Sequence, residues 1–390
     1  MTTIHGFADE GFGPVADAFA ENFRLGTELG AACAVYHHGR LVVDLHAGVA
    51  DDRTGRPWTD DTLTVGFSVT KGLMALCGHL ARQRGLLDFD APVASVWPEF
   101  AAGGKQDIAI RDLFSHRSGL MALDVDLTID DVASWFPVIH AIEEQKPLWE
   151  PGTTFAYHAL MFGWLTGEVL RRVTGLRPGP LIADYLTGPL GADAWIGLPE
   201  SEASRVAYLA APPAALSSAW VEMALALPTV VRSMTLGGAF PPLLIDDRHP
   251  SDFNSRVVQA VEVPAANGIM SARALARIYS AAVSTTDGRP KLLDDASIMD
   301  ALTVRSIDNP WPGALTPPGM RFSTGFLTNG IPHRPLLSDA SFGHDGASGS
   351  LGYADADHEI GFGYVNNSLA GAVDGRANRL TAALRSSMGL

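Results

Sequence analysis

Cysteine, lysine and long apolar runs are scarce in this sequence, and each scarcity excludes a class of protein. Cys33 and Cys77 are the only cysteines among 390 residues, far too few for a disulfide framework. No run of about eighteen uninterrupted apolar residues is present, so we expect no membrane-spanning helix. The first ten residues lack the basic start and apolar core of a secretory signal, and we therefore expect a cytoplasmic protein.

Positive charge is scarce as well. The formal net charge is -15 at pH 7, with 28 lysines and arginines against 43 acidic residues. This balance disfavours nucleic acid and anionic membrane surfaces as partners. Hydrophobic residues make up 47% of the chain and charged residues 18%, which indicates an ordered globular protein with room for two lobes. We expect a small-molecule partner, and the sequence leaves a homo-oligomer open.

Several motifs of known chemistry are missing. The sequence has no His-Glu-x-x-His, no cysteine pair with zinc spacing and no phosphate-binding loop, so we expect neither a metal nor a cofactor. His37-His38 precedes a glycine and is more typical of a hairpin turn than of a metal site. The segment 346–350 has serine where the Gly-x-Ser-x-Gly elbow of α/β-hydrolases requires its last glycine.

Against this background Lys71 stands out, because it is one of four lysines in a chain with twenty-four arginines. Ser68 precedes it by three residues, in a stretch that leads from a loop into a helix, so both side chains share one helix face. A serine hydroxyl becomes a nucleophile when an adjacent base takes its proton. The helix N-terminus adds positive partial charge where an oxyanion would develop. The local pattern leaves open whether this is a catalytic pair or a chance neighbourhood.

The expected elements are strands near both ends of the chain and helices between them. Strand patterns occupy 31–37, 40–47, 322–327, 349–354 and 359–365, and helical patterns occupy 12–23, 68–85, 108–114, 156–173, 272–283 and 376–388. We therefore predict an α+β protein in which residues 1–85 and 319–390 form one antiparallel sheet flanked by the terminal helices. Residues 86–318 would form a mostly helical domain, with the active site at the boundary. Residues 210–253 resist assignment.

Two further stretches carry candidate chemistry. Tyr157 follows the Pro151-Gly152 turn near the start of a predicted helix. His344 lies in the glycine-dense segment 343–352, whose backbone could approach a substrate closely and donate N–H groups. Taken singly, Tyr157 is also typical of a half-buried core tyrosine, and His344 of a loop histidine.

Together, and in this order, the three stretches closely resemble the serine β-lactamase-like superfamily, and within it the class C-like family VIII carboxylesterases. The flanking segments Leu113–Leu120, Pro151–Thr153 and Asn267–Ala272 add to the resemblance. It covers about residues 10 to 385 and is least clear between 200 and 260. It implies the fold shared by β-lactamases and the transpeptidase domain of penicillin-binding proteins.

The resemblance also implies roles for individual residues. Ser68 would be the nucleophile, and Lys71 with Tyr157 would transfer its proton. The backbone N–H groups of Ser68 and Ala347 would form the oxyanion hole. His344-Asp345-Gly346 would match the family's strand motif and bind substrate. Which of Lys71 and Tyr157 is the base stays open, and His116 is expected to be structural.

The sequence departs from the amidases of the superfamily at two positions. Ala159 stands where the Tyr-x-Asn motif has an asparagine that binds the substrate amide, and His344 stands where a lysine is usual. Both changes remove polar anchors, which favours a carboxylesterase for small to medium neutral acyl groups, acting through an acyl-enzyme on Ser68. The alternatives are a biosynthetic acyltransferase, a β-lactamase or D-Ala peptidase, and a catalytically silent binding protein. We expect residues 219–253 and Trp311 to line an apolar cleft.

Overall fold

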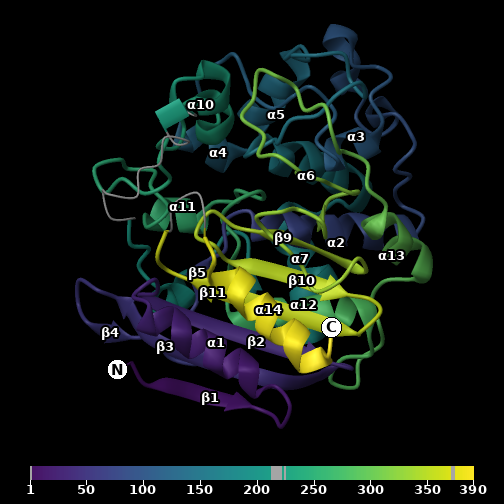
Figure 1. Cartoon of the computed structure of the whole chain (residues 1–390). Helices are drawn as coiled ribbons and strands as arrows, with labels where there is room; N and C mark the ends of the chain where they lie inside the picture. Colours follow the sequence, from purple (N-terminus) through teal and green to yellow (C-terminus); the bar gives the residue numbers. More distant parts are fainter. Residues whose placement is uncertain (1, 212–221, 224, 370–373) are drawn as a thin grey trace.

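An antiparallel sheet forms one half of the molecule and a helical lobe the other (Figure 1). The computed structural model describes residues 2–211, 222–223, 225–369 and 374–390. The strand order is β1-β3-β2-β11-β10-β9-β8, with β4 paired to β3. The strands are β1 (Ile4–Ala8), β2 (Gly30–His37), β3 (Arg40–Asp51), β4 (Arg56–Pro57), β8 (Leu327–Thr328), β9 (Ser341–Asp345), β10 (Leu351–Asp355) and β11 (Ile360–Asn366). Because β2 pairs with β11, the two ends of the chain share one sheet, as predicted.

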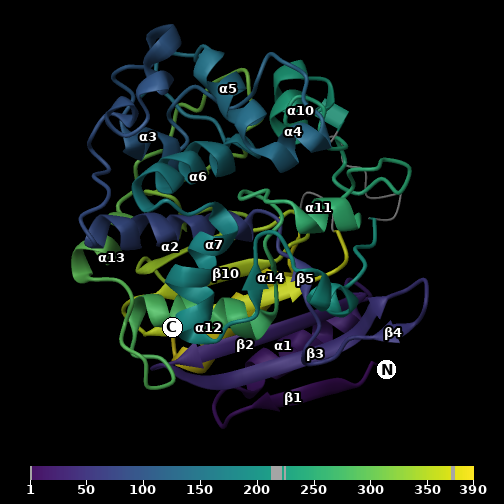
Figure 2. The same ribbon diagram turned by 180° about the vertical axis from the view of Figure 1, so that it is seen from behind.

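The two faces of the sheet are covered by different helices. The terminal helices α1 (Gly13–Arg24) and α14 (Arg376–Met388) pack together on one face. On the other face lie α12 (Ala272–Val283) and α2 (Val69–Gln83) (Figure 2). Strand β11 shows how the sequence sets this arrangement, because successive residues point to opposite faces. Phe362 and Tyr364 belong to the core under the terminal helices, whereas a Cβ on Gly361 or Gly363 would collide with the α12 backbone.

A small second sheet joins the lobe to the main sheet just ahead of Ser68. It consists of β5 (Thr64–Val65), β7 (Ile269–Met270) and β6 (Ala194–Trp195). The remaining α-helices are α3 (Ile110–Phe114), α4 (Ile129–Ser134), α5 (Phe136–Glu144), α6 (Met161–Thr174), α7 (Pro178–Ile182), α8 (Gly188–Leu190), α10 (Pro228–Thr235), α11 (Arg256–Ala260) and α13 (Asp295–Leu302). Short 3-10 helices span Val93–Ser95, Pro98–Gly104 and Glu200–Arg205, and a π-helical turn spans Ala183–Thr187.

The structure confirms most of the predicted elements and corrects two of them. The hairpin at His38-Gly39 and the ranges of α12 and α14 are as predicted. The helix predicted over 156–173 begins only at Met161. The strand predicted over 322–327 is reduced to β8 and isolated bridges at Phe322. The local pattern predicted neither β1 nor β9, although the family resemblance had matched His344-Asp345, at the end of β9, to a strand motif.

The late start of α6 has a long-range cause. The Ala156 N–H donates to the His116 carbonyl at 3.2 Å, and the Trp311 N–H donates to the Phe155 carbonyl at 2.7 Å. These bonds hold the segment before α6 extended between two distant loops, and local helical periodicity does not reveal them.

The predicted division at residues 85 and 318 stays a prediction. Helix α12 lies inside the range assigned to the helical domain, yet it packs on β2, β10 and β11. We propose that α12 belongs with the sheet domain. Among the residues described here, no helix is both long and apolar enough to cross a membrane.

Candidate active site

Ser68 lies directly before α2, at the point where the small sheet meets the main one. The Gly66 N–H donates to the Gly268 carbonyl at 2.8 Å, and Phe67 is bridged to Asn267. Phe67 itself has φ of 49°, an uncommon conformation for a bulky residue. Such backbone strain persists only where surrounding contacts fix it, and it clusters at functional sites. The turn therefore fixes Ser68 at the N-terminus of α2, where its side chain is half-buried and lines a cavity.

Lys71 and Tyr157 converge on the Ser68 hydroxyl. Lys71 Nζ lies 3.0 Å from Ser68 Oγ, and Tyr157 Oη donates to the same oxygen at 2.8 Å. Lys71 Nζ also donates to the Ala265 carbonyl at 2.9 Å. The structure thus brings together the three residues to which the sequence assigned acyl transfer. A serine hydroxyl in contact with an amine and a phenol has the geometry expected of an activated nucleophile.

Burial shifts the pKa values of Lys71 and Tyr157 in opposite directions. It lowers the pKa of the fully buried Lys71 ammonium well below its usual range, and Asp345 opposes this only in part. Burial also raises the pKa of the Tyr157 phenol, although its bond to Ser68 lowers it. Burial therefore favours the neutral amine of Lys71, which has a free lone pair, and the protonated phenol of Tyr157.

His344 lies beside this pair at the end of β9. Its side chain is 2% exposed, and its Nδ1 lies 2.8 Å from the Asp345 carbonyl. Burial, followed by repulsion from Lys71, lowers the pKa of His344 to about 4. The imidazole is therefore neutral at pH 7, and its Nε2 has no partner among the residues that the structure describes. A carboxylate on a substrate would find no positive charge at this position.

Ser68 and Ala347, whose N–H groups are the predicted oxyanion donors, line the same cavity. Neither N–H bonds to another described part of the chain. The turn after β9 is brought to Ser68 by Gly346, because a Cβ at that position would collide with the Gly66 carbonyl. The Gly346 N–H is itself used, since it donates to the Ser350 carbonyl at 2.8 Å. Gly346 therefore allows the turn to approach the backbone before Ser68, and the Ala347 N–H stays available as a donor.

His116 supports the Tyr157 loop, which agrees with its expected structural role. Its Nδ1 accepts from the His158 N–H at 3.1 Å, and its ring centroid lies 5.0 Å from that of Tyr157. His158 in turn contacts Ser118 Oγ through Nε2 at 2.9 Å. Burial lowers the pKa of both histidines, that of His158 to about 4, so both are neutral at pH 7. Tyr157 is thus held by uncharged groups.

A cavity of about 220 Å³ opens in front of Ser68. Apart from Ser68, Tyr157 and Ser233, all its lining side chains are apolar; they are Phe67, Met121, Ala159, Leu160, Val230, Met234, Leu244, Ala266, Ala314, Leu315 and Ala347. Of the predicted range 219–253, the residues that line the cavity are Val230, Ser233, Met234 and Leu244, whereas 219–221 and 224 lie outside the described residues. The prediction for Trp311 is wrong. Its ring packs on Trp149 with centroids 5.1 Å apart, and the nearby Ala314 and Leu315 face the cavity instead.

Sequence reasoning missed two residues of this site. Ala265 contributes its carbonyl to Lys71, and the nearby Asn267-Gly268 pair in the family resemblance was the signal that could have located it. Ser233 is 1% exposed and supplies a third hydroxyl to the cavity, 3.4 Å from the Ala159 nitrogen. Its segment showed no motif, and no signal in the sequence identified it.

Comparison with known proteins agrees with this geometry. The family model described as Beta-lactamase matches residues 19–386. The esterase/beta-lactamase LipL of Mycobacterium tuberculosis is 34% identical over 379 residues, which are 94% of this chain and 83% of that protein. The crystal structure of a family VIII carboxylesterase has a TM-score of 0.87 and 33% identity, covering 99% of this chain and 100% of that one. The structure of EstA from Arthrobacter nitroguajacolicus Rue61a has a TM-score of 0.84 and 33% identity, covering 98% of both chains. The chain therefore belongs to the beta-lactamase family, as the motifs around Ser68, Tyr157 and His344 predicted.

Proposed function

We propose that this protein is a serine carboxylesterase that hydrolyses esters of small to medium neutral acyl groups. The observation that carries the proposal is the contact of Ser68 Oγ with Lys71 Nζ and Tyr157 Oη beside an apolar cavity. The esterase names of LipL, EstA and the family VIII enzyme support it. No metal or cofactor takes part in the proposed chemistry.

The reaction has two steps. In the first, Ser68 Oγ attacks the ester carbonyl carbon while the neutral Lys71 amine takes the hydroxyl proton. The N–H groups of Ser68 and Ala347 stabilise the oxyanion. As the C–O bond to the alcohol breaks, Tyr157 passes its proton to the departing alkoxide and receives one from Lys71. In the second step, water attacks the acyl-enzyme and gives a proton to Lys71. As the bond between Ser68 Oγ and the acyl carbon breaks, Lys71 and Tyr157 pass a proton back to Ser68 and the free acid leaves.

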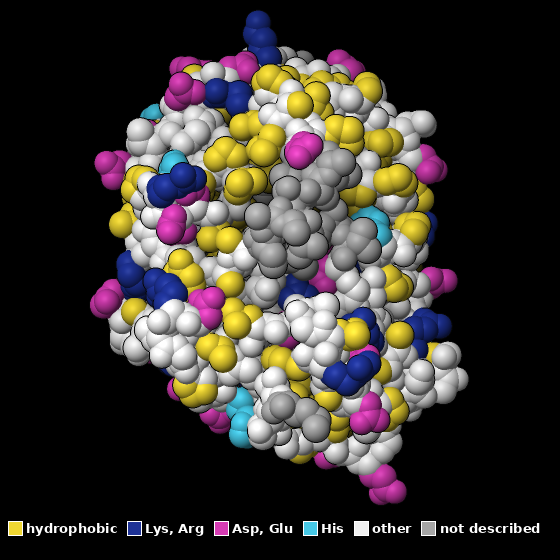
Figure 3. Space-filling model, turned by 60° about the vertical axis from the view of Figure 1, so that its left-hand side comes forward, with side chains coloured by type: hydrophobic (Ala, Val, Ile, Leu, Met, Phe, Trp, Pro, Cys, Tyr) yellow, Lys and Arg dark blue, Asp and Glu magenta, His cyan; other side chains and the backbone are white. Residues whose placement is uncertain are grey.

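The walls of the site favour an uncharged acyl group. Ala159 contributes a methyl group to the cavity, and the buried His344 imidazole is neutral. Burying a charged substrate group without a partner is strongly unfavourable. Leu225 and Leu243 are exposed on the surface, close in sequence to α10 and to Leu244, which line the cavity. Figure 3 shows further hydrophobic side chains across the helical-lobe half of one face. Apolar groups are therefore available both inside the cavity and on the neighbouring surface.

Two substrates test the proposal against its main alternative. We expect kcat/KM for p-nitrophenyl butyrate to be at least a hundredfold higher than that for a chromogenic cephalosporin, because the cephalosporin carboxylate would lie beside the neutral His344. This ratio corresponds to a difference of about 2.7 kcal/mol in activation free energy. Comparable values would contradict the assignment of Ala159 and His344. Product analysis with added alcohol distinguishes the acyltransferase, which would yield a new ester in place of the free acid.

Acyl chain length should control the rate through the cavity volume. At about 30 Å³ per water-sized group, the cavity holds about seven such groups. We expect kcat/KM for p-nitrophenyl esters to rise about fourfold per methylene from acetate towards hexanoate and to fall for longer chains. Val230→Trp places a larger side chain from α10 in the cavity, so it should move the optimal acyl chain to acetate and lower kcat/KM for the octanoate ester more than tenfold. Thr229→Trp, on the same helix but outside the lining, is the control. An unchanged chain-length profile in Val230→Trp would place the acyl group elsewhere.

A further inference from the structure

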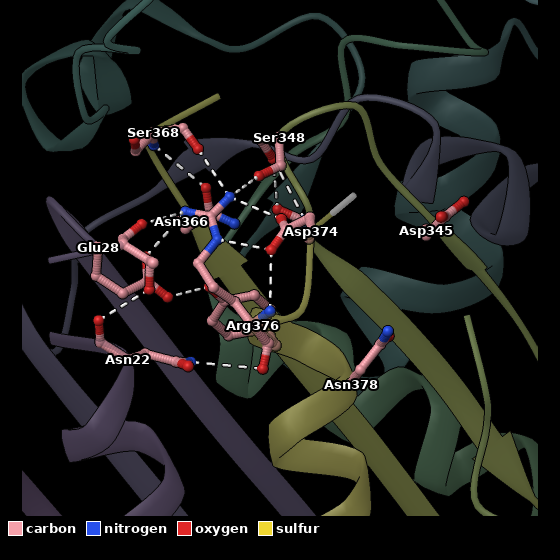
Figure 4. Close-up of polar contacts among 12 residues, drawn as sticks. Asn22, Glu28, Asp345, Ser348, Asn366, Ser368, Asp374, Arg376 and Asn378 are labelled. Atoms are coloured by element: carbon pink, nitrogen blue, oxygen red, sulfur yellow. Dashed lines mark hydrogen bonds and ion pairs between the residues drawn. The ribbon is translucent and has the colours of Figure 1, made fainter. Parts of the chain in front are cut away.

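A buried cluster of charges lies behind the oxyanion turn, at the start of α14 (Figure 4). The Arg376 side chain is 2% exposed and pairs with two carboxylates, those of Glu28 and Asp374, at 3.1 and 2.7 Å. Tyr364 donates a hydrogen bond to Glu28. Taking these charges out of water is unfavourable, and a hydrophobic cluster of similar volume would often be as stable. A role beyond stability therefore has to be sought in the remaining contacts of Arg376.

Those contacts join three backbone segments. Arg376 Nη1 donates to the Thr27 carbonyl at 3.1 Å. Its Nη2 donates to the Ser348 carbonyl at 2.6 Å and to the Ser368 carbonyl at 3.0 Å. Figure 4 shows the guanidinium lying between Glu28, Asp374, Ser348 and Ser368. The planar fork of arginine directs five N–H donors from three nitrogens at these acceptors, whereas the ammonium of lysine has three donors on a single nitrogen.

The Ser348 carbonyl belongs to the turn that carries the proposed oxyanion donor. Ser348 directly follows Ala347, and the Gly349 N–H closes the turn onto the Gly346 carbonyl at 2.8 Å. Gly349 has φ of 94°, and a Cβ there would collide with the Asp374 carboxylate, so Asp374 packs directly behind the turn. Arg376 and Asp374 thus hold this turn from the side opposite the cavity.

The N-terminal side of the turn, at Asp345, is held by a second arginine, Arg334. Arg334 Nε lies 3.2 Å from Asp345 Oδ2, and Arg334 Nη1 donates to Asn378 Oδ1 at 2.9 Å. Both ends of the segment 345–349 are therefore tied to α14 or to the residues before it. An oxyanion hole is effective only when its donors are fixed in advance, since a small displacement weakens the bond formed in the transition state.

We infer that Arg376 is a positioning residue that fixes the Ala347 N–H in the oxyanion hole through its bond to the Ser348 carbonyl. The inference rests on the proposed function, because the hole acts on the tetrahedral intermediate of ester hydrolysis. Arg376 does not line the cavity, and none of its hydrogen bonds is to Ser68. Its effect should therefore appear in transition-state binding and leave ground-state binding unchanged.

The test compares Arg376→Lys with Glu28→Gln. The first retains the charge and loses the fork, so we expect kcat for p-nitrophenyl butyrate to fall about 10- to 100-fold while KM stays within threefold. The affinity for phenylboronic acid, which forms a tetrahedral adduct on a serine nucleophile, should fall by the same factor as kcat. Glu28→Gln alters the cluster on the side away from the turn. Burial raises the pKa of Glu28 to about 7, so the neutral isostere is a mild change, and its kcat should stay within threefold of the wild type.

Each outcome decides the inference. Arg376→Lys overturns it if the variant matches the wild type in kcat and boronate affinity, or if its kcat falls while its boronate affinity is retained. Glu28→Gln overturns it if its kcat falls as much as that of Arg376→Lys. If Arg376→Lys does not fold, Asp374→Asn weakens the same anchor, and wild-type kcat and boronate affinity in that variant overturn the inference. Boronate affinity needs Ser68 and the hole but no turnover. An inactive wild-type protein would therefore count against the esterase proposal, while boronate affinity would still decide the role of Arg376.

Discussion

Replacing Ser68 by alanine is expected to lower kcat for p-nitrophenyl butyrate by about four to six orders of magnitude. The variant loses the only oxygen that contacts both Lys71 Nζ and Tyr157 Oη in the part of the chain that the structure describes. Without it no acyl-enzyme forms, and only the slow attack of water aided by the oxyanion donors remains. Initial rates under saturating ester measure the loss. Mass spectrometry after treatment with a fluorophosphonate should show one adduct on the wild type and none on Ser68→Ala.

A matched variant separates loss of the nucleophile from loss of a cavity hydroxyl. Ser233→Ala also removes a hydroxyl from the cavity wall, but Ser233 contacts the Ala159 nitrogen and neither Lys71 nor Tyr157. We expect it to keep its fluorophosphonate adduct and to lose at most about tenfold in kcat/KM, the size of one neutral hydrogen bond. Retention of more than a hundredth of the wild-type kcat by folded Ser68→Ala would contradict the proposed nucleophile.

The fold was predictable where local pattern and tertiary packing agree. Helix α12 has a Ser271 cap that accepts from the Ala274 N–H at 3.1 Å, and its apolar face is buried, so its limits follow from sequence. The local pattern did not predict strand β9, because Gly343, His344 and Asp345 do not resemble strand residues, and only the family's strand motif at His344-Asp345-Gly346 pointed to it. Gly343 is required there, since a Cβ would collide with the Gly352 carbonyl of the neighbouring strand. That constraint is set across the sheet and leaves no local signal.

The site was predictable to the extent that its chemistry is local or carried by the family motifs. The three-residue spacing of Ser68 and Lys71 is local, and the observed 3.0 Å contact follows from one helical turn. Tyr157 came from the resemblance, because 89 residues separate it from Ser68. Arg376 could not be assigned, since its partner at Ser348 lies 28 residues earlier and its bond is to a backbone carbonyl. Side-chain to backbone bonds of this kind constrain the sequence at one end only.

Lys71→Met and Tyr157→Phe should differ in the substrates on which they lose activity. If Lys71 is the base, Lys71→Met lowers kcat/KM by about 10²- to 10⁴-fold for both p-nitrophenyl butyrate and ethyl butyrate. Nitrophenolate departs without a proton, whereas ethoxide requires one. Tyr157→Phe should therefore lose more on ethyl butyrate than on p-nitrophenyl butyrate. Equal losses on the two esters would show that Tyr157 acts in the attack rather than in the departure of the alcohol.

The pH dependence of kcat/KM identifies the base independently. Protonated Lys71 cannot accept the Ser68 proton, so activity falls as the pH drops through the Lys71 pKa and is restored above it. Because burial lowers that pKa well below 10.5, the acidic limb should lie well below the range of an exposed lysine. Burial raises the Tyr157 pKa above 10, so ionisation of the phenol should reduce activity only at still higher pH. Tyr157→Phe should keep the acidic limb and Lys71→Met should lose it, since the titrating amine is gone. The opposite result, an acidic limb that survives in Lys71→Met and vanishes in Tyr157→Phe, would assign the base to Tyr157 and make Lys71 the group that lowers its pKa.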